Sequence, residues 1–141
     1  MAGKTEQWSD MDSKQAETAA GGIQVADVST MGDVLQLVGT AIADKKGEDI
    51  VVLDLRGAVD YLDYMVICTG NTEIQNRAIV DNIEARLAGC DIIPERLHGY
   101  NHGKWILLDY DILVVHVFTP ELREYYRLED LWAGGQEVSL A

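Results

Sequence analysis

The sequence predicts a single α/β (α+β) domain, in which a mixed sheet of about five strands is covered by helices. Two short apolar runs, Ile50 to Leu55 and Tyr64 to Thr69, have the length and composition of buried strands. Helical patterns that open on capping residues lie on either side of these runs. At 141 residues the chain fits one such domain and can bury a core without disulfides or metal.

Both predicted helices have recognisable start signals. Thr30 with Asp33 resembles a capping box, and the apolar stripe that follows ends in two lysines and a glycine at residues 45–47. Thr72 with Gln75 repeats the capping pattern, and this second helix ends at a glycine. Because the second helix follows an apolar run directly, we expect a strand-helix-strand unit.

The second half of the chain predicts a short strand, a hairpin and a final helix. The short strand is expected near Ile92 to Leu97. Two apolar runs, Trp105 to Leu108 and Ile112 to Phe118, are separated by a short polar loop that suits an antiparallel hairpin. Pro120 then suits the first helical position, where no amide donor is needed.

The two ends of the chain differ in composition from the predicted domain. Residues 1–28 are polar and show no apolar period, so we expect a flexible N-terminal tail that cannot bury enough surface to fold. The folded domain is predicted to span residues 29–133. Residues 134–141 are predicted to form a short C-terminal tail.

The charge balance limits the kind of partner. The chain has 24 acidic and 11 basic residues, a formal net charge of -13. This excess argues against wrapping nucleic acid, because binding to phosphates depends on lysine and arginine displacing counterions. A basic protein partner fits better, although an acidic surface also serves simply to keep a protein soluble.

Cysteine usage and hydropathy indicate a soluble cytoplasmic protein. Cys68 lies within an apolar run and Cys90 follows the predicted end of the second helix, so neither belongs to a paired metal or redox motif. The N-terminus lacks the apolar core of a signal peptide, and no apolar run is long enough to span a bilayer.

The last predicted helix carries more aromatic area than one sheet face can cover. Leu122, Tyr125 and Tyr126 share one helical face, whereas Leu128 and Trp132 continue at a shifted angle. Either the helix breaks near Leu128 or some aromatic side chains face outwards. Exposed tyrosine and tryptophan are favoured interface anchors, because they combine large apolar area with one polar group.

A catalytic interpretation is also open from the residues. Asp109 and Asp111, with Asp54 as third ligand, could hold a divalent cation in a nucleotidyltransferase-like enzyme. Few basic groups stand near these aspartates, and the segment after Thr69 lacks the glycine density of a phosphate cradle. A Cys68–His116 nucleophile pair is a weaker alternative that no spacing supports.

Four sequence blocks in a fixed order resemble the ribosomal silencing factor family, also called the Iojap-like proteins. The blocks are DIVVLDLRG (49–57), DYMVICTGNT (63–72), HGKWILLDY with VVHVF (102–118) and YYRLEDLW (125–132). The resemblance implies a nucleotidyltransferase-like topology without the catalytic site. It implies no enzymatic activity and no cofactor or metal. It also implies a homodimer when free.

The same resemblance implies a function and a set of contact residues. Members of the family bind the large ribosomal subunit through large-subunit ribosomal protein fourteen and block joining of the small subunit. The resemblance assigns partner contacts to Trp105 and Tyr126, and we extend it to their pattern neighbours Asp109, Tyr110 and Trp132. At Asp111 this chain departs from the family pattern, in which glycine is usual within the hairpin loop.

Overall fold

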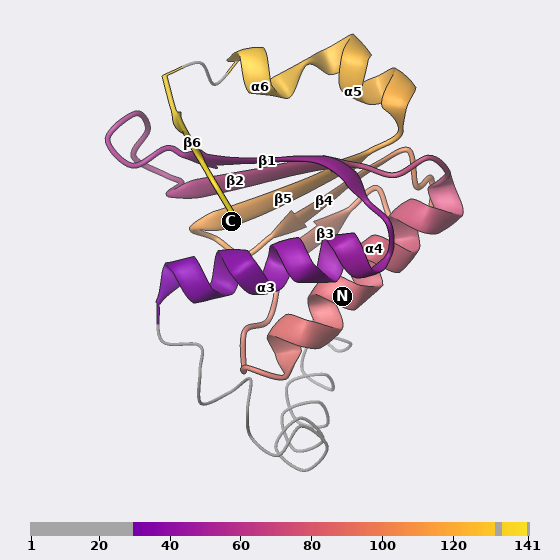
Figure 1. Ribbon diagram of the computed structural model, residues 1–141, viewed down its shortest axis with the longest axis horizontal. Coiled ribbons are helices and arrows are strands. Elements are labelled where there is room, and N and C mark those ends of the chain that lie inside the picture. The colour runs from indigo at the N-terminus through magenta and orange to yellow at the C-terminus, as the bar shows by residue number, and fades with distance from the viewer. Residues whose placement is uncertain (1–29, 132–133, 141) are drawn as a thin grey trace.

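A mixed sheet forms the middle layer of the molecule, with helices on both of its faces (Figure 1). The computed structural model describes residues 30–131 and 134–140. The strands are β1 (Glu48–Asp54), β2 (Tyr64–Thr69), β3 (Arg96–His98), β4 (Trp105–Asp109), β5 (Leu113–Phe118) and β6 (Gln136–Val138). The helices are α3 (Met31–Asp44), α4 (Glu73–Ala88), α5 (Pro120–Tyr126) and α6 (Leu128–Leu131). The predicted α+β class is confirmed.

The strand order in the sheet is β3-β4-β5-β2-β1-β6. The central pair, β2 and β5, is parallel, and every other neighbouring pair is antiparallel. A parallel pair needs a long crossover connection, which α4, β3 and β4 supply here. The strands that carry the buried apolar runs therefore lie in the middle of the sheet.

The helix starts follow the predicted capping residues. The Thr30 hydroxyl accepts a hydrogen bond from the Asp33 amide at 3.2 Å, and the Thr72 hydroxyl accepts one from the Gln75 amide at 3.0 Å. The return bond of a capping box differs, because the Gln75 side chain accepts from the amide of Asn71 at 2.8 Å.

The two faces of the sheet bury separate clusters. Helices α3 and α4 cover one face, and α5 and α6 lie over the other (Figure 1). Val66, Val115 and Val117 point to the α3/α4 side, in the larger cluster. Met65, Ile67 and Phe118 point to the α5/α6 side, together with Leu122 and Leu128 from the two short helices. Period-two alternation along β2 and β5 explains this division.

The C-terminal segment is part of the sheet, which differs from the predicted tail. β6 pairs antiparallel with β1, with Val138 opposite Val52. Leu140 then packs on α3 so closely that a Cβ placed on Gly39 would lie 2.7 Å from it. The segment is short and mostly polar, so its own sequence gives little strand signal, and pairing with the edge of β1 decides its conformation. The predicted N-terminal tail lies outside the described residues.

Within the described ranges, no helix combines the length and the apolar character needed to cross a membrane.

Candidate partner-binding surface

Successive side chains of β4 point to opposite faces of the sheet, and this alternation decides which of them can face a partner. Ile106 and Leu108 point into the α3/α4 cluster and are fully buried. Trp105, Leu107 and Asp109 point to the other face and stay partly exposed. Trp105 is partly buried at the margin of the smaller cluster.

Five rings form a contiguous series on this face, which we call the aromatic cluster. Its members are Trp105, His116, Phe118, Tyr125 and Tyr126. The Trp105 ring lies 4.9 Å from that of Phe118 and 4.7 Å from that of Tyr126. Tyr126 meets Tyr125 edge to face at 5.0 Å. Phe118 is fully buried, Tyr126 is 43% exposed and Tyr125 is 77% exposed, so the cluster runs from the core to the surface.

The aromatic cluster contains one internal polar contact. The Trp105 indole Nε1 donates a hydrogen bond to Nδ1 of His116 at 3.1 Å. His116 is only 5% exposed, and burial lowers its pKa to about 4. The imidazole is therefore neutral at physiological pH and can act as the acceptor.

Helix α4 fixes the start of β4 and hence the position of Trp105. The Asn76 side-chain amide donates to the Gly103 carbonyl at 2.7 Å, and the Arg77 guanidinium donates to the Asn101 carbonyl at 3.1 Å. Gly103 has a φ of 77°, and a Cβ at this position would lie 2.7 Å from that of Glu73. Only glycine fits both the backbone conformation and the close approach of α4.

Helix α5 is held on the sheet by one arginine. Arg123 pairs with Glu129 of α6 at 3.0 Å, and its Nη1 donates to the Thr69 hydroxyl at 2.9 Å and to the Asp49 carbonyl. The chain turns between α5 and α6 at Arg127, whose φ of 47° is left-handed. The sequence left two alternatives open, a break near Leu128 or outward-facing aromatic side chains, and both are found, since Tyr125 and Tyr126 are also exposed.

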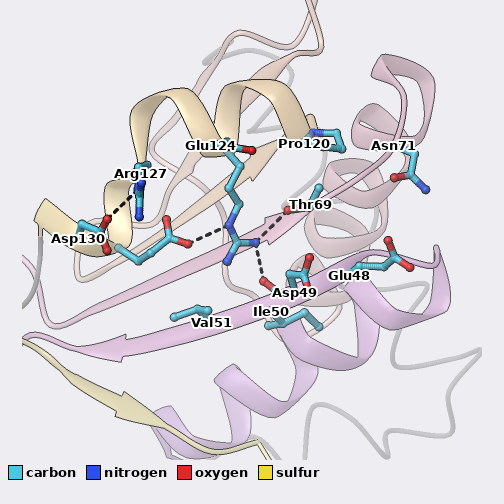
Figure 2. A pocket seen from close by; sticks show the side chains of 12 residues that line it. Glu48, Asp49, Ile50, Val51, Thr69, Asn71, Pro120, Glu124, Arg127 and Asp130 are labelled. Carbon is cyan, nitrogen blue, oxygen red and sulfur yellow. Dashed lines mark hydrogen bonds and ion pairs between the residues drawn. The ribbon is translucent and has the colours of Figure 1, made fainter.

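An acidic cleft of about 890 Å³ lies between α5/α6 and the neighbouring ends of β1 and β2 (Figure 2). Its lining includes two arginines, and each of them is paired with a carboxylate of α6. Glu48, Asp49 and Glu124 add three further carboxylates. The lining therefore has an excess of negative charge, on the side of α5 that faces β1 and β2.

The structure brings together only some of the predicted contact residues. Trp105 and Tyr126 are in ring contact, and Asp109 lies farther along the same face of β4. Tyr110 is 8% exposed and belongs to the α3/α4 cluster, so it is not on this surface. Its position is explained by strand alternation, which turns the residue after Asp109 to the opposite side. Trp132 lies outside the described residues.

Three members of the aromatic cluster were not among the predicted contact residues, namely His116, Phe118 and Tyr125. Tyr125 is the most exposed of the cluster's tyrosines. For His116 the relevant signal is the register of the hairpin, that is, which residues of β4 and β5 lie opposite each other. His116 lies opposite Leu107, on the face that also carries Trp105. The sequence locates the hairpin loop, but which residues lie opposite each other is set in the assembled hairpin.

The ligands of the catalytic alternative do not converge. Asp54 lies on β1, whereas Asp109 lies on β4, and both β2 and β5 stand between these strands. Asp54 is held by Arg56, whose guanidinium donates to both carboxylate oxygens and lowers the pKa of the carboxyl group. In the described part of the chain, no group of three His, Cys, Asp or Glu side chains is arranged to hold a metal ion.

The cysteine–histidine alternative is also separated by the sheet. Cys68 belongs to the α3/α4 cluster, whereas His116 contacts rings on the opposite face. Burial raises the pKa of the Cys68 thiol to about 12, which disfavours the nucleophilic thiolate.

Comparison with known proteins gives one consistent family. The profile described as "Ribosomal silencing factor during starvation" matches residues 28–141. The chain is 40% identical over 108 residues to a ribosomal silencing factor from Halalkalibacterium halodurans, covering 77% of this chain and 92% of that protein. It is 30% identical over 115 residues to an Iojap-related mitochondrial protein from Arabidopsis thaliana, covering 77% of this chain and 62% of that one.

A solved structure agrees with this assignment. A crystal structure of a Chromobacterium violaceum protein superposes with a TM-score of 0.72 at 32% identity, covering 80% of this chain and 93% of the other. The chain therefore belongs to the ribosomal silencing factor family, whose role is ribosome-associated repression of translation.

Proposed function

We propose that this protein represses translation by binding the large ribosomal subunit through large-subunit ribosomal protein fourteen. The bound protein occupies the face that meets the small subunit and blocks subunit joining sterically. This mechanism needs only occupancy and no chemical step. In the free state we expect a homodimer.

The observation that carries this proposal is the exposed end of the aromatic cluster. Tyr125 and Tyr126 expose large rings beside the partly covered Trp105, and among the described residues they are left 77% and 43% exposed. Rigid aromatic side chains of this kind are common binding hot spots.

Charge supports the same kind of partner. Glu124 stands on α5 next to the two tyrosines, and the acidic cleft continues from it towards β1. A ribosomal protein that presents basic side chains complements such a surface. Asp109 extends the negative charge along β4, and Trp132 remains a predicted contact from the family resemblance.

Truncation of the two central rings tests the surface. We expect Trp105→Ala and Tyr126→Ala each to weaken co-sedimentation with purified large ribosomal subunits by roughly thirtyfold, about 2 kcal/mol. Tyr61→Ala is the matched control, because Tyr61 is 69% exposed but precedes β2 at the opposite end of the sheet from Trp105.

Stability measurements separate binding from folding. Tyr126→Ala should change the denaturant midpoint little, since the side chain is partly exposed. If Trp105→Ala and Tyr126→Ala bind subunits as well as Tyr61→Ala does, per folded molecule, the aromatic surface is not the binding site. Subunit joining assayed by light scattering then tests whether binding alone blocks the small subunit.

A further inference from the structure

The direction of the Trp105 indole N–H limits what a partner can meet at this ring. Tryptophan has one polar atom, and it can only donate. In this structure that donor is directed inwards to Nδ1 of His116 at 3.1 Å. The accessible part of Trp105 therefore offers a partner apolar ring atoms and no hydrogen-bond donor.

The residues around His116 fix its ring as the hydrogen-bond acceptor. His116 lies in the middle of β5, 5% exposed, with its ring stacked on Phe118 at a 6.0 Å centroid separation and an 11° interplanar angle. Because Nδ1 accepts, the ring proton is on Nε2. Packing thus fixes the ring plane, and the hydrogen bond fixes the tautomer.

We propose that His116 is a positioning residue for partner binding, which locks the Trp105 indole with its N–H inwards and its ring outwards. This inference rests on the proposed function, which supplies the partner that the locked ring contacts. It also names the partner chemistry at this point: an aliphatic or cationic side chain against the ring, rather than an acceptor for the indole N–H. A guanidinium or ammonium group over an indole face is a favourable contact.

Two substitutions at His116 separate the hydrogen bond from the packing. His116→Leu puts an apolar side chain of similar bulk at this position and removes the acceptor. His116→Asn loses the ring but places an amide oxygen near the position of Nδ1. Trp105→Phe removes the donor from the other side without altering the buried position on β5.

The first measurement is direct and does not involve the ribosome. The Trp105 indole N–H resonance, assigned by its loss in Trp105→Phe, should exchange with solvent at least about tenfold faster in His116→Leu than in the parent. His116→Asn should keep the exchange within about threefold of the parent. Unchanged exchange in His116→Leu overturns the inference and leaves the proposed function standing.

The second measurement uses co-sedimentation with purified large ribosomal subunits. His116→Leu should weaken binding by roughly tenfold, the size of one lost hydrogen bond, and His116→Asn should restore most of it. In the Trp105→Phe background, His116→Leu should change binding by less than about twofold, because the contact it removes is already absent.

The outcomes distinguish the two proposals. If His116→Leu frees the indole and leaves binding intact while Trp105→Ala weakens it, positioning is refuted and the binding surface is supported. If neither Trp105→Ala nor His116→Leu affects binding, the binding surface itself is wrong. If His116→Leu weakens binding equally in the parent and the Trp105→Phe background, His116 acts structurally and not through the indole.

Discussion

At the scale of single residues, Asp111 shows how a non-glycine residue is held in a tight hairpin loop. Asp111 has a φ of 77°, in the region that favours glycine. Its amide donates to Oδ1 of Asp109 at 2.8 Å, so the neighbouring aspartate stabilises the turn. The Asp109 carboxylate, which had suggested a metal ligand, therefore has a local role in the hairpin loop.

Asp111→Gly should increase the free energy of unfolding by about 0.5–1 kcal/mol. The gain comes from relief of the left-handed conformation, about 1–2 kcal/mol, less the greater entropy of glycine in the unfolded chain. Chemical denaturation measures the change. Asp111→Ala is the control and should be destabilising, since alanine keeps the Cβ and loses the side chain that tolerates this region. A loss of stability in Asp111→Gly would contradict the strain argument.

At the scale of elements, α5 depends on tertiary contacts. The helix is short and has no fully buried residue, so propensity alone cannot hold it. Arg123, with a side chain 13% exposed, connects α5 to α6 and to the ends of β1 and β2. By contrast, the Arg127–Asp130 pair is 69% and 61% exposed. These two arginines therefore form a natural comparison.

Arg123→Met should lower the free energy of unfolding by roughly 2 kcal/mol, because it leaves a partly buried carboxylate and a hydroxyl without their charged donor. Arg127→Met should cost less than about 0.5 kcal/mol, as is usual for an exposed ion pair. Denaturant midpoints of both variants, compared with the parent, measure this difference. Equal effects at the two positions would show that Arg123 does not anchor the helix.

At the scale of the whole molecule, negative charge exceeds positive charge by 13. Arg56, Arg86, Arg123 and Arg127 are each engaged in an ion pair within the chain. Most carboxylates of the described residues lie at the surface, with Glu84 a buried exception, and they favour a basic partner and speed its approach.

Binding to large ribosomal subunits should therefore weaken as salt rises. The Debye length falls from about 10 Å at 0.1 M to about 3 Å at 1 M, which screens the acidic surface. We expect a loss of roughly tenfold in affinity, about 1.4 kcal/mol, with the desolvated aromatic contact retained. Co-sedimentation over a salt series measures the slope. Tyr126→Ala should bind more weakly than the parent at every salt concentration, with the same dependence of affinity on salt. A parent affinity that does not change with salt would show that charge does not contribute to binding.

Much of the secondary structure could be predicted from local sequence. Thr30 and Thr72 cap the two long helices, Pro120 begins α5, and the change of helical face near Leu128 marks the break before α6. These features depend on interactions within a few residues, so a sequence pattern contains the information they need.

The candidate site could be predicted only in part. The sequence singled out Trp105 and Tyr126, but it did not separate them from Tyr110, which alternation turns into the opposite cluster. Nor did it give the acceptor for the Trp105 indole, since this depends on the register between β4 and β5. Register fixes which side chains share a face across strands, and it is set by the assembled hairpin.

By itself, the sequence determined the α+β class, the bounds of the long helices and central strands, and the family, because local capping, apolar runs and ordered motifs are properties of neighbouring residues. Only the tertiary structure decided that Gln136–Val138 completes the sheet, that Tyr110 is buried, and that Trp105, His116 and Tyr126 meet. Each of these features depends on contacts between residues that are far apart in the chain. Their free energy comes from pairing and packing that exist only once the sheet has formed.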